Sequence, residues 1–235
     1  MALPQINLFP KYTSTIPSTG DEFTYRPFLV KEQKVLLIAL ESRDEKAILQ
    51  SVVDTIESCT YEDIKVNTLA TFDVEYMFTK IRSKSVGETT DINIKCNACE
   101  EFNELTVPLE QIKMDVPKDN CTIKLTPDFT LKMRYPSYKH LIAISEIDSN
   151  TLTEGMYEMI VVCLSNLQTE DENILFIDET RESIDDFLNN LNTEQFDLLV
   201  KFVTDLPKMS YDINFDCIKC TKSNTHTLQG MQDFF

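Results

Sequence analysis

The spacing of apolar residues predicts helices in two separated parts of the chain. In residues 31–88, three segments repeat apolar residues every three or four positions. The helix from about Lys31 is apolar on all faces, which predicts that it is buried. A capping box over residues 42–45 is expected to open the second helix, and Thr71 to cap the third, which ends near Gly87.

Helical spacing returns in residues 136–207. Three apolar stripes there predict helices, namely Met156, Ile160, Cys163 and Leu167; Ile184, Phe187, Leu188 and Leu191; and Phe196, Leu199, Val200 and Val203. The two helical parts are therefore separated by residues 89–135, which lack this helical spacing.

Residues 89–135 alternate apolar and polar positions, which is the period of a strand. One hairpin is expected around residues 92–107 and a second over residues 121–133. Residues 1–30 predict an extended arm with a short strand at 23–26, and residues 208–235 a C-terminal strand or hairpin. This order indicates an α+β fold. We expect one compact unit over residues 1–235, with two helical lobes around a small antiparallel sheet.

Two distant segments of the chain are copies of one element. Residues 91–107 read DINIKCNACEEFNELTV, and residues 212–228 read DINFDCIKCTKSNTHTL. At an offset of 121 they share seven of seventeen residues, including both cysteines of a Cys-x-x-Cys pair. Each pair lies between two strand-like runs, as it does in a metal-binding knuckle.

The two Cys-x-x-Cys pairs predict a closed, zinc-ribbon-like site. Four thiolates complete a tetrahedral zinc shell, so one structural Zn²⁺ per chain would be held by Cys96, Cys99, Cys217 and Cys220. Closing the long loop between the pairs costs roughly 4 kcal/mol. A structural zinc contributes roughly 10 kcal/mol or more, so the loop is no obstacle.

Other readings of the cysteines stay open. Neither pair is followed by the glycine usual in knuckles, because Glu100 and Thr221 stand there. The alternative is two reduced turns that bind no metal. His226 could replace one ligand, but its alignment with Leu105 favours a half-buried strand residue. A lone four-thiolate site also suits iron. The other three cysteines are expected in the core, and they are Cys59, Cys121 and Cys163.

The net charge of the chain and the absence of enzyme motifs disfavour several classes of protein. Asp and Glu number 39 against 22 Lys and Arg, a formal net charge of −17. Such a surface repels phosphates, so we expect no nucleic-acid partner and no membrane partner. The paired knuckles nevertheless keep a nucleic-acid-binding zinc ribbon as an alternative. No phosphate loop or hydrolase motif is present, and only two histidines occur, so we expect no enzyme. A metalloenzyme would need an open coordination position.

Three short stretches are candidates for partner binding. They contribute Tyr25, Arg26 and Phe28; Lys80, Arg82 and Lys84; and Phe234 and Phe235. The first mixes aromatic and basic residues, as interface hot spots do, or anchors the first helix. The second is locally basic, and either docks a partner or pairs with the protein's own carboxylates. The third contains two Phe residues whose side chains are costly to leave in water unless they pack on the protein itself or on a partner.

Four segments carry a family resemblance. Residues 16–42 and 69–88, with LKMRYP at 131–136 and the final MQDFF, resemble the baseplate hub and hub-assembly proteins of T-even-type contractile-tailed bacteriophages. The resemblance implies a non-enzymatic, chaperone-like assembly factor that binds hub or tape-measure proteins in the host cell cytoplasm during tail assembly. Its alternative is a permanent subunit of the virion baseplate hub.

Overall fold

The computed structural model describes residues 9–117, 121–145 and 152–230, and its contacts group the chain into two compact units. Unit 1 consists of residues 1–115 and 208–235, and unit 2 of residues 116–207. Unit 2 is therefore inserted into the chain of unit 1. Whether the two units pack together into the one compact unit expected over 1–235 stays a prediction.

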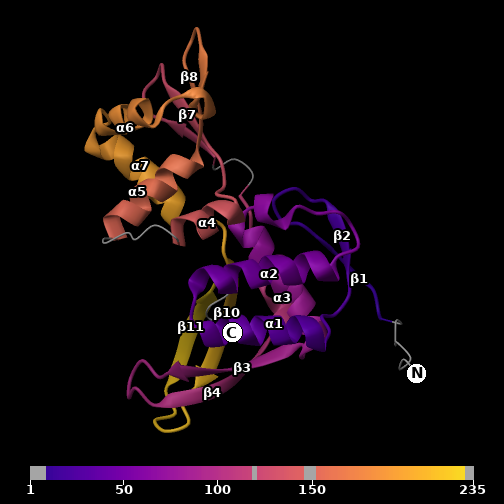
Figure 1. The fold of residues 1–235 in the computed structure, drawn as a ribbon. Helices are drawn as coiled ribbons and strands as arrows, with labels where there is room; N and C mark the ends of the chain where they lie inside the picture. Colours follow the sequence, from indigo (N-terminus) through magenta and orange to yellow (C-terminus); the bar gives the residue numbers. More distant parts are fainter. Residues whose placement is uncertain (1–8, 118–120, 146–151, 231–235) are drawn as a thin grey trace, which may run out of the picture. The chain divides into compact units, whose positions relative to one another are not determined.

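Unit 1 begins with a hairpin and three helices. Strands β1 (Tyr12–Thr15) and β2 (Glu22–Tyr25) pair antiparallel, and Gly20 takes a φ of 78° in the turn between them. The helices are α1 (Val30–Ser42), α2 (Glu45–Cys59) and α3 (Thr71–Ser85), with a 3-10 turn η1 (Val66–Thr68) before α3. Figure 1 shows these helices beside the strands of the same unit.

Two of the predicted helix starts are shifted by the local hydrogen bonds. The cap of α2 is Asp44, whose carboxylate accepts the backbone N–H of Lys46, whereas Ser42 is the last residue of α1. The predicted cap Thr71 is the first residue of α3, with Ala70 in the cap position. α3 ends at Ser85, two residues before Gly87 as expected.

The prediction that the first helix is buried on all faces is wrong. Of the α1 residues, Glu32 and Ala39 are buried, on the side that packs against α2. Large apolar side chains on the rest of the helix are exposed, and these are Val30, Val35, Leu37, Ile38 and Leu40. Apolar residues occur on all faces of α1, but the described residues bury only one of these faces.

Two hairpins form the second half of unit 1. β3 (Thr89–Lys95) pairs with β4 (Phe102–Pro108), and β10 (Met209–Asp216) pairs with β11 (Ser223–Gln229). The 3-10 turn η2 (Leu109–Gln111) and the short strand β5 (Lys113–Met114) follow the first hairpin, and β5 extends the second one at β10. The predicted hairpin around residues 92–107 is thus confirmed.

The inward faces of these two hairpins share one core. Alternate residues along each strand are buried, as expected for a sheet with one solvated face. The buried members of this core are Ile94, Val107, Leu109, Ile112, Met209, Ile213, Phe215 and Leu228. Residues more than a hundred positions apart in the sequence therefore meet in unit 1.

Unit 2 has its own sheet, of strand order β6-β7-β8-β9. The strands are β6 (Thr122–Lys124), β7 (Thr130–Met133), β8 (Leu164–Gln168) and β9 (Asn173–Leu175), and a 3-10 turn η3 (Phe176–Asp178) follows. Its helices are α4 (Tyr138–Ser145), α5 (Leu152–Cys163), α6 (Arg181–Asn189) and α7 (Thr193–Thr204). The predicted hairpin over 121–133 is confirmed as β6 and β7.

This sheet corrects two expectations. Leu167 was predicted on a helical stripe with Cys163, but α5 ends at Cys163 and Leu167 lies on β8. Both face the same core, so the helical spacing continued by chance into the strand. The fold is α+β with small antiparallel sheets, but the helical lobes do not surround one sheet. Each unit contains sheets of its own in the part of the chain described.

Candidate metal centre

The four cysteines of the repeated segments lie at the tips of the two hairpins. Each Cys-x-x-Cys forms the turn between β3 and β4 or between β10 and β11. In the first turn the N–H of Glu100 donates to the carbonyl of Cys96 over 3.0 Å. In the second, the N–H of Thr221 donates to the carbonyl of Cys217 over 2.9 Å. The two turns are thus built alike, as the repeat predicted.

The turns bring all four thiols together. The Sγ atoms of Cys96, Cys99, Cys217 and Cys220 all lie within 4.8 Å of one another. Two pairs cross between the hairpins, with Cys96 Sγ 3.7 Å from Cys220 Sγ and Cys99 Sγ 3.6 Å from Cys217 Sγ. The predicted ligand set is therefore assembled at metal-binding distance, with Cys96 and Cys217 buried and Cys220 exposed.

Backbone and amide donors surround the sulfurs. The N–H of Ala98 points at Cys96 Sγ and that of Lys219 at Cys217 Sγ, each over 3.4 Å. The N–H groups of Ala98 and Cys220 are the main causes that lower the pKa values of Cys96, to about 6, and of Cys217. At Cys99 the N–H of Glu101 also acts to lower the pKa, but burial and the neighbouring thiols raise it to about 12. The N–H donors therefore favour the thiolate forms of Cys96 and Cys217, whose negative charge a bound cation would neutralise.

Two asparagines of the repeat tie the hairpins to each other. Asn103 Oδ1 accepts the N–H of Ile218 over 2.9 Å, and Asn224 Oδ1 accepts the N–H of Asn97 over 3.0 Å. Asn103 and Asn224 are equivalent positions of the two copies, and both are buried. Each copy thus accepts a hydrogen bond from the knuckle of the other. The sequence showed this identity, but no role for it could be assigned without the pairing of the hairpins.

The two copies also share a cross-strand hydrogen bond further from the cysteines. Thr106 Oγ1 donates to Asp91 Oδ1, and Thr227 Oγ1 donates to Asp212 Oδ1, each over 2.6 Å. Both pairs join residues directly opposite in the strand register. Five of the seven residues shared by the two copies therefore take part in the cysteine cluster, the asparagine bonds or these cross-strand bonds.

The residues that replace the usual knuckle glycine take a glycine conformation. Glu100 has a φ of 58° and Thr221 a φ of 56°, both in the left-handed region. This region is unfavourable for residues with a Cβ, above all for a branched one. The knuckle geometry is thus kept in spite of the missing glycines, at a cost in backbone strain.

The remaining cysteines and histidines lie outside the cluster. Burial raises the pKa of Cys59 to about 11 and that of Cys163 to about 12, and it also raises the pKa of Cys121. These thiols pack in or beside the cores, as predicted. His226 is a partly buried strand residue whose ring stacks on Phe215, at 6.0 Å between centroids. His140 lies near the start of α4, within 2.9 Å of the Ser137 hydroxyl.

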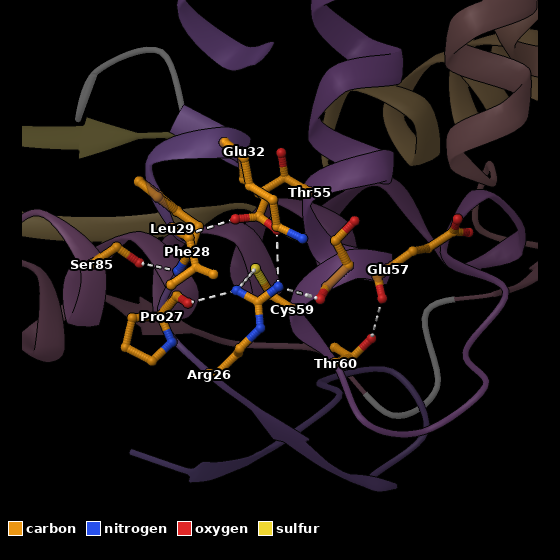
Figure 2. Close-up of polar contacts among 12 residues, drawn as sticks. Arg26, Pro27, Phe28, Leu29, Glu32, Thr55, Glu57, Cys59, Thr60 and Ser85 are labelled. Atoms are coloured by element: carbon orange, nitrogen blue, oxygen red, sulfur yellow. Dashed lines mark hydrogen bonds and ion pairs between the residues drawn. The ribbon is translucent and has the colours of Figure 1, made fainter. Parts of the chain in front are cut away.

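The first candidate stretch for partner binding is engaged within unit 1. Tyr25 is buried, beside Tyr12 and Phe23. Arg26 donates to Glu32 Oε1 over 2.9 Å, to the carbonyl of Ser58 and to Cys59 Sγ (Figure 2).

Phe28 belongs to the same connection between β2 and α1. Its N–H donates to Ser85 Oγ at the end of α3, over 2.9 Å (Figure 2). In this structure the stretch 25–28 therefore anchors the start of α1.

The basic stretch is also engaged with neighbouring groups. Lys84 forms ion pairs with Glu88 and Glu110, and hydrogen bonds with Glu110 and Glu88 raise its pKa. Lys80 lies over the ring of Tyr76, and burial lowers the pKa of Arg82. The third candidate pair, Phe234 and Phe235, lies outside the described residues.

Comparison with known proteins places the chain in a family of phage tail proteins. The family described as T4 bacteriophage base plate protein matches residues 9–235. The chain therefore belongs to this base plate protein family, which confirms the resemblance carried by its sequence motifs.

A curated relative is the baseplate hub assembly protein gp26 of Enterobacteria phage T4. The chain is 23% identical to it over 211 residues, which cover 89% of this chain and 90% of that protein. No solved structure matches the chain. None of the helices in the described ranges is long and apolar enough to cross a bilayer.

Proposed function

We propose that the protein is a non-enzymatic assembly factor of the phage baseplate hub, which binds other hub or tape-measure components and is stabilised by a structural zinc ion. It acts in the host cell cytoplasm while the tail is built. The name of the T4 relative supports a role in hub assembly. The observation that carries the proposal is the exposed apolar surface of α1.

The exposed apolar side chains of α1 are the surface of unit 1 that we expect a partner to bury. Its five exposed apolar side chains have relative exposures from 48% at Val35 to 79% at Val30. A helix that is apolar all round is normally buried, and large exposed apolar patches mark interaction sites. Another baseplate component is the partner that fits a member of this family. The protein would work by presenting this helix on a rigid unit.

Placing negative charge on the apolar surface of α1 tests this role. The double variant Leu37→Glu and Ile38→Glu should fold normally, because both side chains are exposed, but should fail to support hub assembly. The control is Ile177→Glu, which places one glutamate at an apolar site 77% exposed in unit 2. Each variant would be supplied to cells infected by phage that lacks the protein, and assembled baseplates counted by electron microscopy. Normal assembly with the α1 variant would refute the proposal.

The cysteine cluster fits a structural zinc ion. Tetrahedral zinc with Zn–S bonds of about 2.3 Å places its sulfurs about 3.8 Å apart. The two sulfur pairs that cross between the hairpins, at 3.7 and 3.6 Å, meet this requirement. Four thiolates leave no position open for water, which supports a structural role and a zinc-ribbon-like arrangement of the hairpins. Native mass spectrometry would tell zinc from iron.

The fate of the protein after assembly separates two forms of this function. An assembly factor leaves before the tail is complete, whereas a permanent hub subunit stays in the virion. Mass spectrometry of purified tails decides between them, because a retained subunit would be found in a fixed ratio to other baseplate proteins. If the protein is needed to build tails but is completely absent from purified tails, it acts as an assembly factor.

A further inference from the structure

A groove in unit 2 runs between strand β6 and helix α7. It has a volume of about 330 Å³ and is lined by Thr122, Ile123 and Lys124 from β6 and by Leu198, Lys201 and Phe202 from α7. The side chain of Gln195 donates to the carbonyl of Leu125 over 3.1 Å, which ties the start of α7 to the end of β6. The groove is therefore already formed in the protein without a partner.

One wall of the groove is an unpaired strand edge. β6 is the first strand of the order β6-β7-β8-β9, so only its β7 side is paired among the described strands. Bonds to β7 are made at Cys121 and Leu125, and the period of two assigns Ile123 to the same set. The backbone N–H and C=O groups of Thr122 and Lys124 therefore face away from β7. These are the groups that an added strand would pair with.

The lining of the groove supplies apolar surface from α7 and positive charge from both walls. Leu198 on α7 is 42% exposed, whereas Phe202 beside it is buried in the core of unit 2. Lys124 and Lys201 make no ion pair with the described residues, although the protein carries a net charge of −17. Asp205 is the acidic residue of the lining. Two lysines against one aspartate favour a partner of negative charge.

We propose that this groove binds an extended acidic segment of a partner protein, which adds as a strand to the free edge of β6. Strand addition gives affinity through main-chain hydrogen bonds, and side chains on alternate positions enter the neighbouring groove. An apolar side chain of the segment would lie between Ile123 and Leu198, with acidic residues next to Lys124 and Lys201. This site is separate from α1 and from the cysteine cluster, so it stands or falls independently of the proposed function.

The test uses two synthetic peptides and the full-length protein labelled with ¹⁵N. The first peptide, acetyl-Gly-Glu-Phe-Asp-Leu-Glu-Gly-amide, alternates acidic and apolar residues, and the second replaces each acidic residue by Lys. We expect the acidic peptide to shift the amide signals of β6 and α7 and the basic peptide to bind at least about tenfold more weakly. Shifts that map elsewhere, or equal binding of both peptides, would overturn the proposal.

Two variants separate the strand edge from the charge. Thr122→Pro removes an N–H that faces the groove and leaves the bonds to β7 in place, so it should abolish binding while β7 and β8 keep their amide signals. Lys201→Glu should weaken binding about fivefold. Lys139→Glu makes the same charge change outside the groove and should bind like the unchanged protein. Unaltered binding to the Thr122→Pro variant would show that no strand is added.

Discussion

At the scale of single residues, the knuckle turns store strain that one substitution can release. Thr221 keeps a left-handed φ of 56° despite its branched Cβ. Thr221→Gly should raise the free energy of unfolding by about 1 kcal/mol, since glycine takes this conformation freely but loses more backbone entropy on folding. Urea denaturation would measure the gain. Thr221→Ala retains the Cβ and should give much less of it, and an equal gain from Ala would show that backbone strain is not the cause.

A second residue-scale feature is the reciprocal bond between the two copies. Asn224→Ala leaves the N–H of Asn97 without its acceptor near the buried thiols. We expect a loss of about 2 kcal/mol in the free energy of unfolding, because a polar group then lacks its partner. Asn214→Ala is the control, since Asn214 is exposed on the neighbouring strand. Equal losses from both variants in urea denaturation would argue against a special role of the cross-hairpin bond.

At the scale of elements, two buried carboxylates give opposite dependences on pH. Burial acts to raise the pKa of Glu32, but hydrogen bonds from Arg26 and from the N–H of Leu29 outweigh it and lower the pKa. These bonds hold the start of α1. Their stabilising effect is therefore present above the unfolded-state pKa and is lost as the pH falls through the lower folded-state pKa. Asp73 on α3 has the opposite shift, because burial outweighs its bonds from Ser18 and raises the pKa.

These shifts predict opposite effects of two amide substitutions. Glu32→Gln should flatten the loss of stability that occurs as the pH falls through the lowered folded-state pKa of Glu32, where the carboxylate of the unchanged protein becomes protonated. The Asp73 contribution is present at low pH and is lost as the pH rises through its folded-state pKa. Asp73→Asn should therefore remove a loss of stability that occurs on raising the pH. Urea midpoints measured from pH 3 to pH 8 would check both, and identical pH profiles for the two variants would contradict these assignments.

The elements also show what the sequence can and cannot specify. The alternation around Ile92 and Leu105 predicts its hairpin, and the repeat predicts the four ligands, because both signals are local. Strand β8 escapes prediction because it starts directly after Cys163, where apolar spacing continues the helix pattern. The separate sheet of unit 2 depends on pairing β7 with β8, across a long stretch of chain. The role of Asn103 and Asn224 likewise depends on contacts that only the fold creates.

At the scale of the whole molecule, the cysteine cluster joins the two parts of unit 1 between which unit 2 is inserted in the sequence. The two knuckles lie on either side of unit 2 in the sequence, so a bound ion would join the chain before the insertion to the chain after it. The core of unit 2 is built entirely from residues within unit 2, including Leu131, Ile160 and Leu199. Loss of the ion should therefore unfold the hairpin core of unit 1 and leave unit 2 folded.

Hydrogen exchange on a cysteine double variant tests this division. Cys217→Ser with Cys220→Ser should lose one zinc ion per chain by native mass spectrometry and lose protection in β3, β4, β10 and β11, while β7, β8 and α5 stay protected. The control Cys163→Ala makes a cavity in the core of unit 2, so it should keep the metal and reduce protection there. If the double variant exposed both units equally, the ion would stabilise the molecule as a whole. If the unchanged protein held no metal and the double variant were fully protected, the hairpins would be held by their shared core and asparagine bonds alone.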